Sequence, residues 1–202
     1  MMFAAIAVGV QLFVAAQAPP AQVPPQAPQP AIHEYNLGVA AYRKGDMAES
    51  IAAFDRAIAI FPDYWKALSS RGVAKHDIND LDGALRDYSR SIQINPKNAA
   101  AFSNRGVTLR DRGDRDGALA DYSAALSLDP MDYYTYSNRG VIRVDRGDLD
   151  GAMADFDRAL EIKPDYAEAL FNRSMTRRKK GDVAGADADR TKAIALNPKL
   201  GR

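Results

Sequence analysis

Four arginines are each followed by an aspartate at a constant distance in the sequence, so that each arginine and its aspartate could form an ion pair. The aspartate follows its arginine by sixteen residues each time: Arg71 and Asp87, Arg105 and Asp121, Arg139 and Asp155, Arg173 and Asp189. The same register holds Leu37 and Ala53 earlier in the chain, so the two charges appear and disappear together. A buried charge without a partner is strongly destabilising. We predict structural ion pairs, within one repeat or between adjacent repeats; the alternative is a recent duplication with both residues on solvated faces.

Residues that usually carry catalysis or bind metals are absent or isolated. The chain has no cysteine, which removes disulfides, thiol nucleophiles and thiolate metal sites. His33 and His76 are its two histidines, and neither has partners at the spacing of a metal site. Phosphate-binding glycine loops, serine elbows and HExxH motifs do not occur. We therefore expect no enzyme activity, no catalytic residue, no metal and no cofactor.

Charge argues against a nucleic-acid partner. The formal net charge is +1 over 202 residues, so the chain as a whole has no field that would attract a polyanion. One basic cluster, residues 177–180, stands out. It either meets an anionic patch on a partner or lipid headgroups beside an anchored protein, or it complements the dipole at the end of a helix.

The elements that position these residues follow a period of 34 residues, the signature of stacked repeats. The prolines after residue 30 mark it: Pro62, Pro96, Pro130, Pro164 and Pro198. Each repeat also carries small residues at three fixed places and, in four of the five, an aromatic residue at a fourth, which lets two helices pack closely. A Gly-Asp or Asn-Asp pair between the helices predicts a left-handed turn followed by a helix cap.

At these columns the chain resembles the tetratricopeptide repeat (TPR) family, whose unit is a 34-residue helix–turn–helix. The resemblance implies an all-α fold, a TPR α-solenoid in which antiparallel helix pairs form a right-handed superhelix. It covers residues 31–200 in five repeats: 31–64, 65–98, 99–132, 133–166 and 167–200.

The resemblance also implies a concave groove lined by the first helix of each repeat. An asparagine column lies there, and a carboxamide can pair with both polar groups of a peptide unit. The alternative is that these asparagines satisfy neighbouring backbone groups or water. Apolar and aromatic residues are expected to floor the same groove. The predicted peptide-binding residues are Tyr35, Asn36, Val39, Tyr42, Asn104, Val107, Asn138, Val141, Asn172 and Met175.

The first thirty residues differ from the rest. Residues 1–16 are largely apolar and predict a signal peptide or a short apolar anchor. Residues 17–30 are rich in proline, alanine and glutamine and predict an extended linker. The protein is thus expected to be exported, periplasmic or secreted, with membrane-anchored and cytoplasmic forms as alternatives. An anchor would place the array near a membrane.

Two functions from different classes remain. The first is a non-catalytic adaptor or scaffold that binds an extended segment of a protein or peptide partner in its concave groove. The second is a structural or assembly protein of an envelope complex that acts by self-association or spacing. The sequence identifies neither the partner nor the oligomeric state.

Overall fold

The computed structural model of this chain describes residues 26–201. The predicted signal or anchor at residues 1–16, and most of the predicted linker, lie outside the described residues. Within the described part the chain forms ten α-helices and no β-strand. The all-α solenoid of antiparallel helix pairs predicted from the sequence is confirmed.

Each repeat contributes two helices, A and B. The A helices are α1 (Gln29–Arg43), α3 (Trp65–Asp77), α5 (Ala99–Asp111), α7 (Tyr133–Asp145) and α9 (Ala167–Lys179). The B helices are α2 (Met47–Ile60), α4 (Leu81–Ile94), α6 (Arg115–Leu128), α8 (Leu149–Ile162) and α10 (Val183–Leu196). A short 3₁₀ turn, η1 (Pro198–Gly201), follows α10.

The first helix begins two residues before the predicted start of the array. Gln29 and Pro30, assigned to the linker from sequence, form the first turn of α1. Proline is tolerated there because the first N–H groups of a helix have no partner within the helix. The predicted end of the linker at residue 30, which was based on proline-rich composition, is therefore two residues too late.

The turn between helices A and B is built alike in every repeat. Its first residue is left-handed, with φ of +94° at Gly113 and +65° at Asn79, the residue that replaces glycine in the second repeat. The next residue is an aspartate whose carboxylate caps helix B. Asp114, for example, accepts a hydrogen bond from the backbone N–H of Gly117 at 2.9 Å.

Proline ends each B helix through the residue before it. Phe61 follows the last residue of α2 and has φ −137° and ψ 90°, well outside helical values. The ring of Pro62 disfavours the helical conformation for the residue it follows. The 34-residue spacing of proline therefore fixes where every hairpin stops.

The core of a hairpin is a glycine on helix A against an aromatic ring on helix B. A Cβ added to Gly106 would lie 2.7 Å from the ring of Tyr122, which is fully buried. Gly140 and Phe156 repeat this contact at 2.7 Å. Any larger residue would push the helices apart, which explains the paired glycine and aromatic columns of the sequence.

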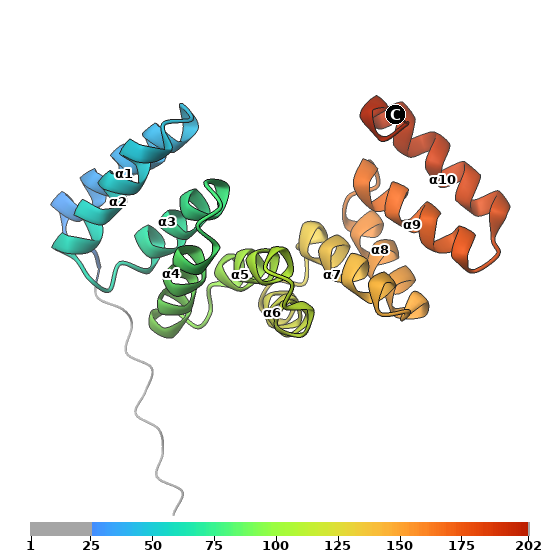
Figure 1. The fold of residues 1–202 in the computed structure, drawn as a ribbon, viewed down its shortest axis with the longest axis horizontal. Helices are drawn as coiled ribbons and strands as arrows, with labels where there is room; N and C mark the ends of the chain where they lie inside the picture. The colour runs from blue at the N-terminus through green and yellow to red at the C-terminus, as the bar shows by residue number, and fades with distance from the viewer. Residues whose placement is uncertain (1–25, 202) are drawn as a thin grey trace, which may run out of the picture.

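The five hairpins follow one another along an open arc (Figure 1). Helices α3, α5, α7 and α9 lie toward the hollow of the arc, and α4, α6 and α10 lie outside it. The A helices therefore line the concave surface of the array.

Candidate functional site

The sixteen-residue arginine and aspartate columns meet inside each hairpin. Nε and Nη2 of Arg105 donate to the two carboxylate oxygens of Asp121 at 2.7 and 2.8 Å. Asp121 is only 5% exposed. This two-point geometry is the strongest form of a charged hydrogen bond. The same arrangement joins Arg71 to Asp87, Arg139 to Asp155, and Arg173 to Asp189.

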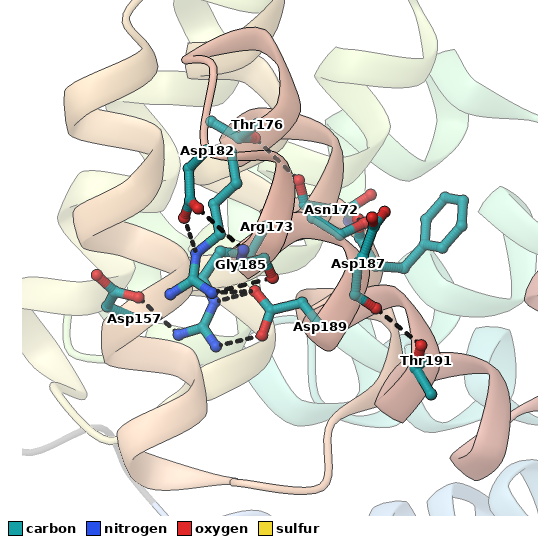
Figure 2. Close-up of polar contacts among 12 residues, drawn as sticks. Asp157, Asn172, Arg173, Thr176, Asp182, Gly185, Asp187, Asp189 and Thr191 are labelled. Atoms are coloured by element: carbon teal, nitrogen blue, oxygen red, sulfur yellow. Dashed lines mark hydrogen bonds and ion pairs between the residues drawn. The ribbon is translucent and has the colours of Figure 1, made fainter.

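The third guanidinium nitrogen of each arginine reaches the preceding repeat. Nη1 of Arg173 donates to Asp157 on α8 at 2.7 Å while the other two nitrogens hold Asp189, as Figure 2 shows. The arginine therefore joins helices A and B of its own repeat to helix B of the repeat before. The other acceptors at this position are Asp55, Ser89 and Ser123.

Sequence reasoning predicted a pair within or between repeats, whereas each arginine makes both contacts. The sequence contained a sign of the acceptors that the prediction missed, since the column to which they belong carries a side-chain oxygen in all five repeats. The member of this column in the fifth repeat is Thr191, which donates to the backbone carbonyl of Asp187. We call the arginines with both sets of acceptors the arginine ladder.

A second cation supports three of the four buried aspartates. Nη1 of Arg143 lies 2.9 Å from a carboxylate oxygen of Asp155. Lys75 and Arg177 stand in the same place beside their own aspartates. Asp121 has no such neighbour, because the chain carries Leu109 there. The third repeat thus depends on Arg105 alone, and the hydrogen-bonded carboxylate raises the pKa of Arg105 although burial opposes it.

The asparagine column lies on the A helices, but its members differ in what they contact. Oδ1 of Asn138 accepts a hydrogen bond from Arg110 at 3.2 Å, and its Nδ2 is buried without a partner among the described residues. Asn104 and Asn172 show no side-chain hydrogen bond within residues 26–201, and neither carboxamide is sealed from solvent. Asn36 is exposed. Within the described residues, therefore, Asn36, Asn104 and Asn172 make no side-chain hydrogen bond, whereas Asn138 is held by Arg110.

The predicted apolar residues of the surface fall into two groups. Val107 and Val141 are partly buried and Met175 is exposed along the middle and last repeats. In the first repeat the predicted residues gather at one place. They line a cavity of about 220 Å³ between repeats 1 and 2, formed by Tyr35, Val39, Tyr42, Phe54, Ser70 and Val73.

Polar side chains join consecutive A helices on the same surface. The hydroxyl of Tyr42 donates to Asp77 at 2.5 Å, and this hydrogen bond raises the pKa of Tyr42 to about 12. One repeat further, His76 Nε2 lies 2.9 Å from Asp111. Burial alone would raise the pKa of Asp111, but hydrogen bonds from His76 and Arg110 lower it. These acidic residues therefore have partners within the array.

The basic cluster at residues 177–180 is largely engaged inside the protein. Arg177 lies 3.2 Å from Asp189, Arg178 pairs with Asp187, and Lys180 pairs with Asp150 of the preceding repeat. The last contact belongs to a series at the ends of the A helices, which also contains Arg112–Asp82 and Arg146–Asp116. Neither interpretation of this cluster included these ion pairs within the array.

Two further observations concern what residues 26–201 contain. They hold no group of three or more histidine, aspartate or glutamate side chains arranged to bind a metal ion. Across the same residues, no helix combines the length and the apolar character that crossing a bilayer requires.

The fold and the repeated packing define a class of all-α solenoid proteins. A sequence model of the tetratricopeptide repeat family matches this chain in five overlapping windows: residues 15–64, 35–99, 71–133, 103–167 and 138–195. The chain belongs to the tetratricopeptide repeat family, whose fold serves protein interaction. No functionally curated protein matches the sequence.

Several solved structures share the fold. PilW, described as a widely conserved type IV pilus biogenesis factor, is 22% identical with a TM-score of 0.77, over 84% of this chain and 79% of that one. MamA from Desulfovibrio magneticus RS-1 is 17% identical with a TM-score of 0.75, over 86% and 98%. YrrB, described as a TPR protein with an unusual peptide-binding site, is 21% identical with a TM-score of 0.68, over 83% and 87%. At these identities the likeness concerns the fold alone.

Proposed function

We propose that this protein is a non-catalytic adaptor that binds an extended segment of a partner protein along its concave surface. The observation that carries the proposal is the pair of unengaged carboxamides, Asn104 and Asn172, on A helices that face the hollow of the arc. Each offers a donor and an acceptor to a peptide backbone. Val107 and Met175 lie one turn further along the same helices and supply apolar surface beside them.

The charges of the array fit a binding role better than a reaction. The buried aspartates are held by two-point arginine contacts, so their carboxylates are committed to structure. The arginine ladder joins each hairpin to helix B of the hairpin before it, and this stacking holds the carboxamides of successive A helices in place. A preorganised surface loses less entropy when an extended peptide binds.

The test is to capture partners with the full chain, identify them by mass spectrometry and measure the binding of a peptide from the captured protein by calorimetry. Replacing Asn104 and Asn172 together by alanine should weaken binding by about 1–3 kcal/mol, from about 0.5–1.5 for each hydrogen-bonded site. Asn138→Ala should have a smaller effect, because Arg110 already holds that side chain. Gln93→Ala on the exposed side of α4 is the matched control. Unchanged affinity in the double variant, with intact helicity, would place the partner elsewhere.

An assembly role is the second candidate. The similarity to PilW, a pilus biogenesis factor by description, favours it, and so does the exposed Leu37 on the first repeat. Light scattering over a concentration series separates the two candidates, since a strict monomer at high concentration contradicts self-association. Export through residues 1–16 belongs to the same proposal, and the intact mass of protein from its native host tests it. Cleavage after Ala16 supports export, and retention of residues 3–16 on membranes supports an anchor.

A further inference from the structure

We propose that the cavity between repeats 1 and 2 binds an apolar side chain, aromatic or branched aliphatic, of an extended partner segment that carries a lysine or arginine next to it. This inference rests on the proposed function, since it states which side chains the bound segment presents at the first junction of the array.

The lining of the cavity suits an apolar side chain. Three aromatic rings, Tyr35, Tyr42 and Phe54, and two valines, Val39 and Val73, surround a space of about 220 Å³. Ring packing holds the wall in place, because the centroid of Tyr35 lies 5.8 Å from that of Phe54. Concave sites with mostly apolar walls and a few polar groups are where proteins bind side chains and small ligands.

The cavity lies where the asparagine column is interrupted. Ser70 stands at the position that holds asparagine in the other four repeats, and its hydroxyl takes the place of a larger carboxamide. At the junction of repeats 3 and 4 the equivalent positions hold Asn138 and Arg110, which are hydrogen-bonded at 3.2 Å. Serine therefore leaves room at the first junction where larger polar side chains meet at the third. At the first junction, therefore, the protein recognises a side chain of the bound segment, whereas the asparagines of the column contact its backbone.

The rim of the cavity carries a negative charge. Asp77 accepts the hydroxyl of Tyr42, a neutral donor. Its other partner, Nδ1 of His76, lies 3.5 Å away and is charged only when protonated. No lysine or arginine within residues 26–201 pairs with Asp77, whereas Asp111 in the next repeat is paired with Arg110. A cation beside the apolar side chain of the ligand would complete this rim.

The experiment follows valine methyl signals of the full chain by NMR during titration with capped peptides. The probes are N-acetyl-phenylalaninamide and the capped dipeptides Phe-Lys, Phe-Glu and Ala-Lys. Saturable shifts are expected at Val39 and Val73, with the exposed Val183 of α10 as an internal control in a distant repeat. Phe-Lys should bind about threefold more tightly than Phe-Glu, the size of an exposed ion pair.

Two variants make the assignment specific. Ser70→Asn introduces the residue that four other repeats carry, so the fold tolerates it, and it should weaken Phe-Lys binding about tenfold through lost apolar burial. Asp77→Asn should remove the preference for Phe-Lys over Phe-Glu. Ser127→Asn, the same exchange at an exposed position of α6, is the matched control and should leave the shifts at Val39 unchanged.

Three results would overturn the proposal: no saturable shift at Val39 and Val73, equal binding by wild type and Ser70→Asn, or tighter binding of Ala-Lys than of the phenylalanine probes. Failure here remains separate from failure of the proposed function. Loss of the cavity signal leaves the dependence of a captured peptide on Asn104 and Asn172 intact. If instead the asparagines prove silent, the shifts at the cavity stand on their own.

Discussion

In the first repeat, Leu37 and Ala53 stand where the four later repeats place arginine and aspartate, yet all five hairpins have the same helices and turns. The hairpin does not need the ion pair. Within residues 26–201 no helix B precedes the first repeat, so an arginine at position 37 would find no such acceptor there for its third nitrogen. The arginine ladder therefore connects successive repeats as well as the two helices of each hairpin.

The largest expected effect comes from removing one arginine of the ladder. Arg105→Leu leaves Asp121 buried without any cation and should lower the free energy of unfolding by about 3–5 kcal/mol. Arg139→Leu is the matched comparison, because Arg143 still contacts Asp155 at 2.9 Å, and its cost should be smaller. Denaturant unfolding of both variants measures the difference. Equal losses would show that the second cation contributes nothing.

A double exchange brings the third repeat to the residues of the first. Arg105→Leu with Asp121→Ala removes both charges, so stability should recover most of the loss caused by Arg105→Leu alone. The coupling energy of the cycle is expected near the upper end of about 0.5–3 kcal/mol for residues in direct contact. Strict additivity of the two single changes would contradict the pairing.

The junction of repeats 1 and 2 offers a test through pH. Asp77 holds the pKa of Tyr42 near 12, above its ordinary value of 10.0, through a hydrogen bond to the protonated hydroxyl. This contact stabilises the fold fully below pH 10 and is lost as pH rises through the folded-state pKa. NMR titration of the Tyr42 ring carbons measures the value, and Asp77→Asn should return it toward 10. An unshifted Tyr42 in the wild type would refute the contact.

The smallest effect is expected at the exposed pairs near the ends of the A helices. Arg112 lies 3.2 Å from Asp82, and both side chains are more than half exposed. Arg112→Ala should therefore change stability by about 1 kcal/mol or less, and less again in high salt. Ile78, which holds the same place in the second repeat, shows that the position tolerates an apolar residue. Thermal unfolding at two salt concentrations checks the result, and a loss as large as that of Arg105→Leu would contradict this ranking.

The sequence was sufficient wherever one residue determines one local conformation. Glycine before aspartate specified the turns, and proline specified the ends of the B helices. The pairing of Arg105 with Asp121 was also predictable, because arginine and aspartate occur together in four repeats and are both replaced in the first. The bond from Arg105 to Ser89 was missed because it depends on how successive hairpins stack.

The features of the concave surface required coordinates. An asparagine column in the sequence makes its members look equivalent, but Asn138 is held by Arg110, whose side chain crosses from the preceding repeat. The cavity beside Ser70 exists because serine is smaller than asparagine. A smaller side chain can be recognised as the wall of a cavity only when the positions of the neighbouring side chains are known. Sequence spacing therefore placed these residues on one surface without showing which were free to bind.

The direction of the arginine ladder has a consequence for how the chain acquires its structure. Each arginine donates from its third nitrogen to an acceptor in the repeat that precedes it, as Arg173 does to Asp157. A protein is made from its N-terminus, and its N-terminal parts generally fold first during synthesis. When one of these arginines leaves the ribosome, the hairpin that carries its outer acceptor has therefore already been translated. The contacts of the arginine ladder are therefore expected to form from the first junction to the last as the chain is synthesised.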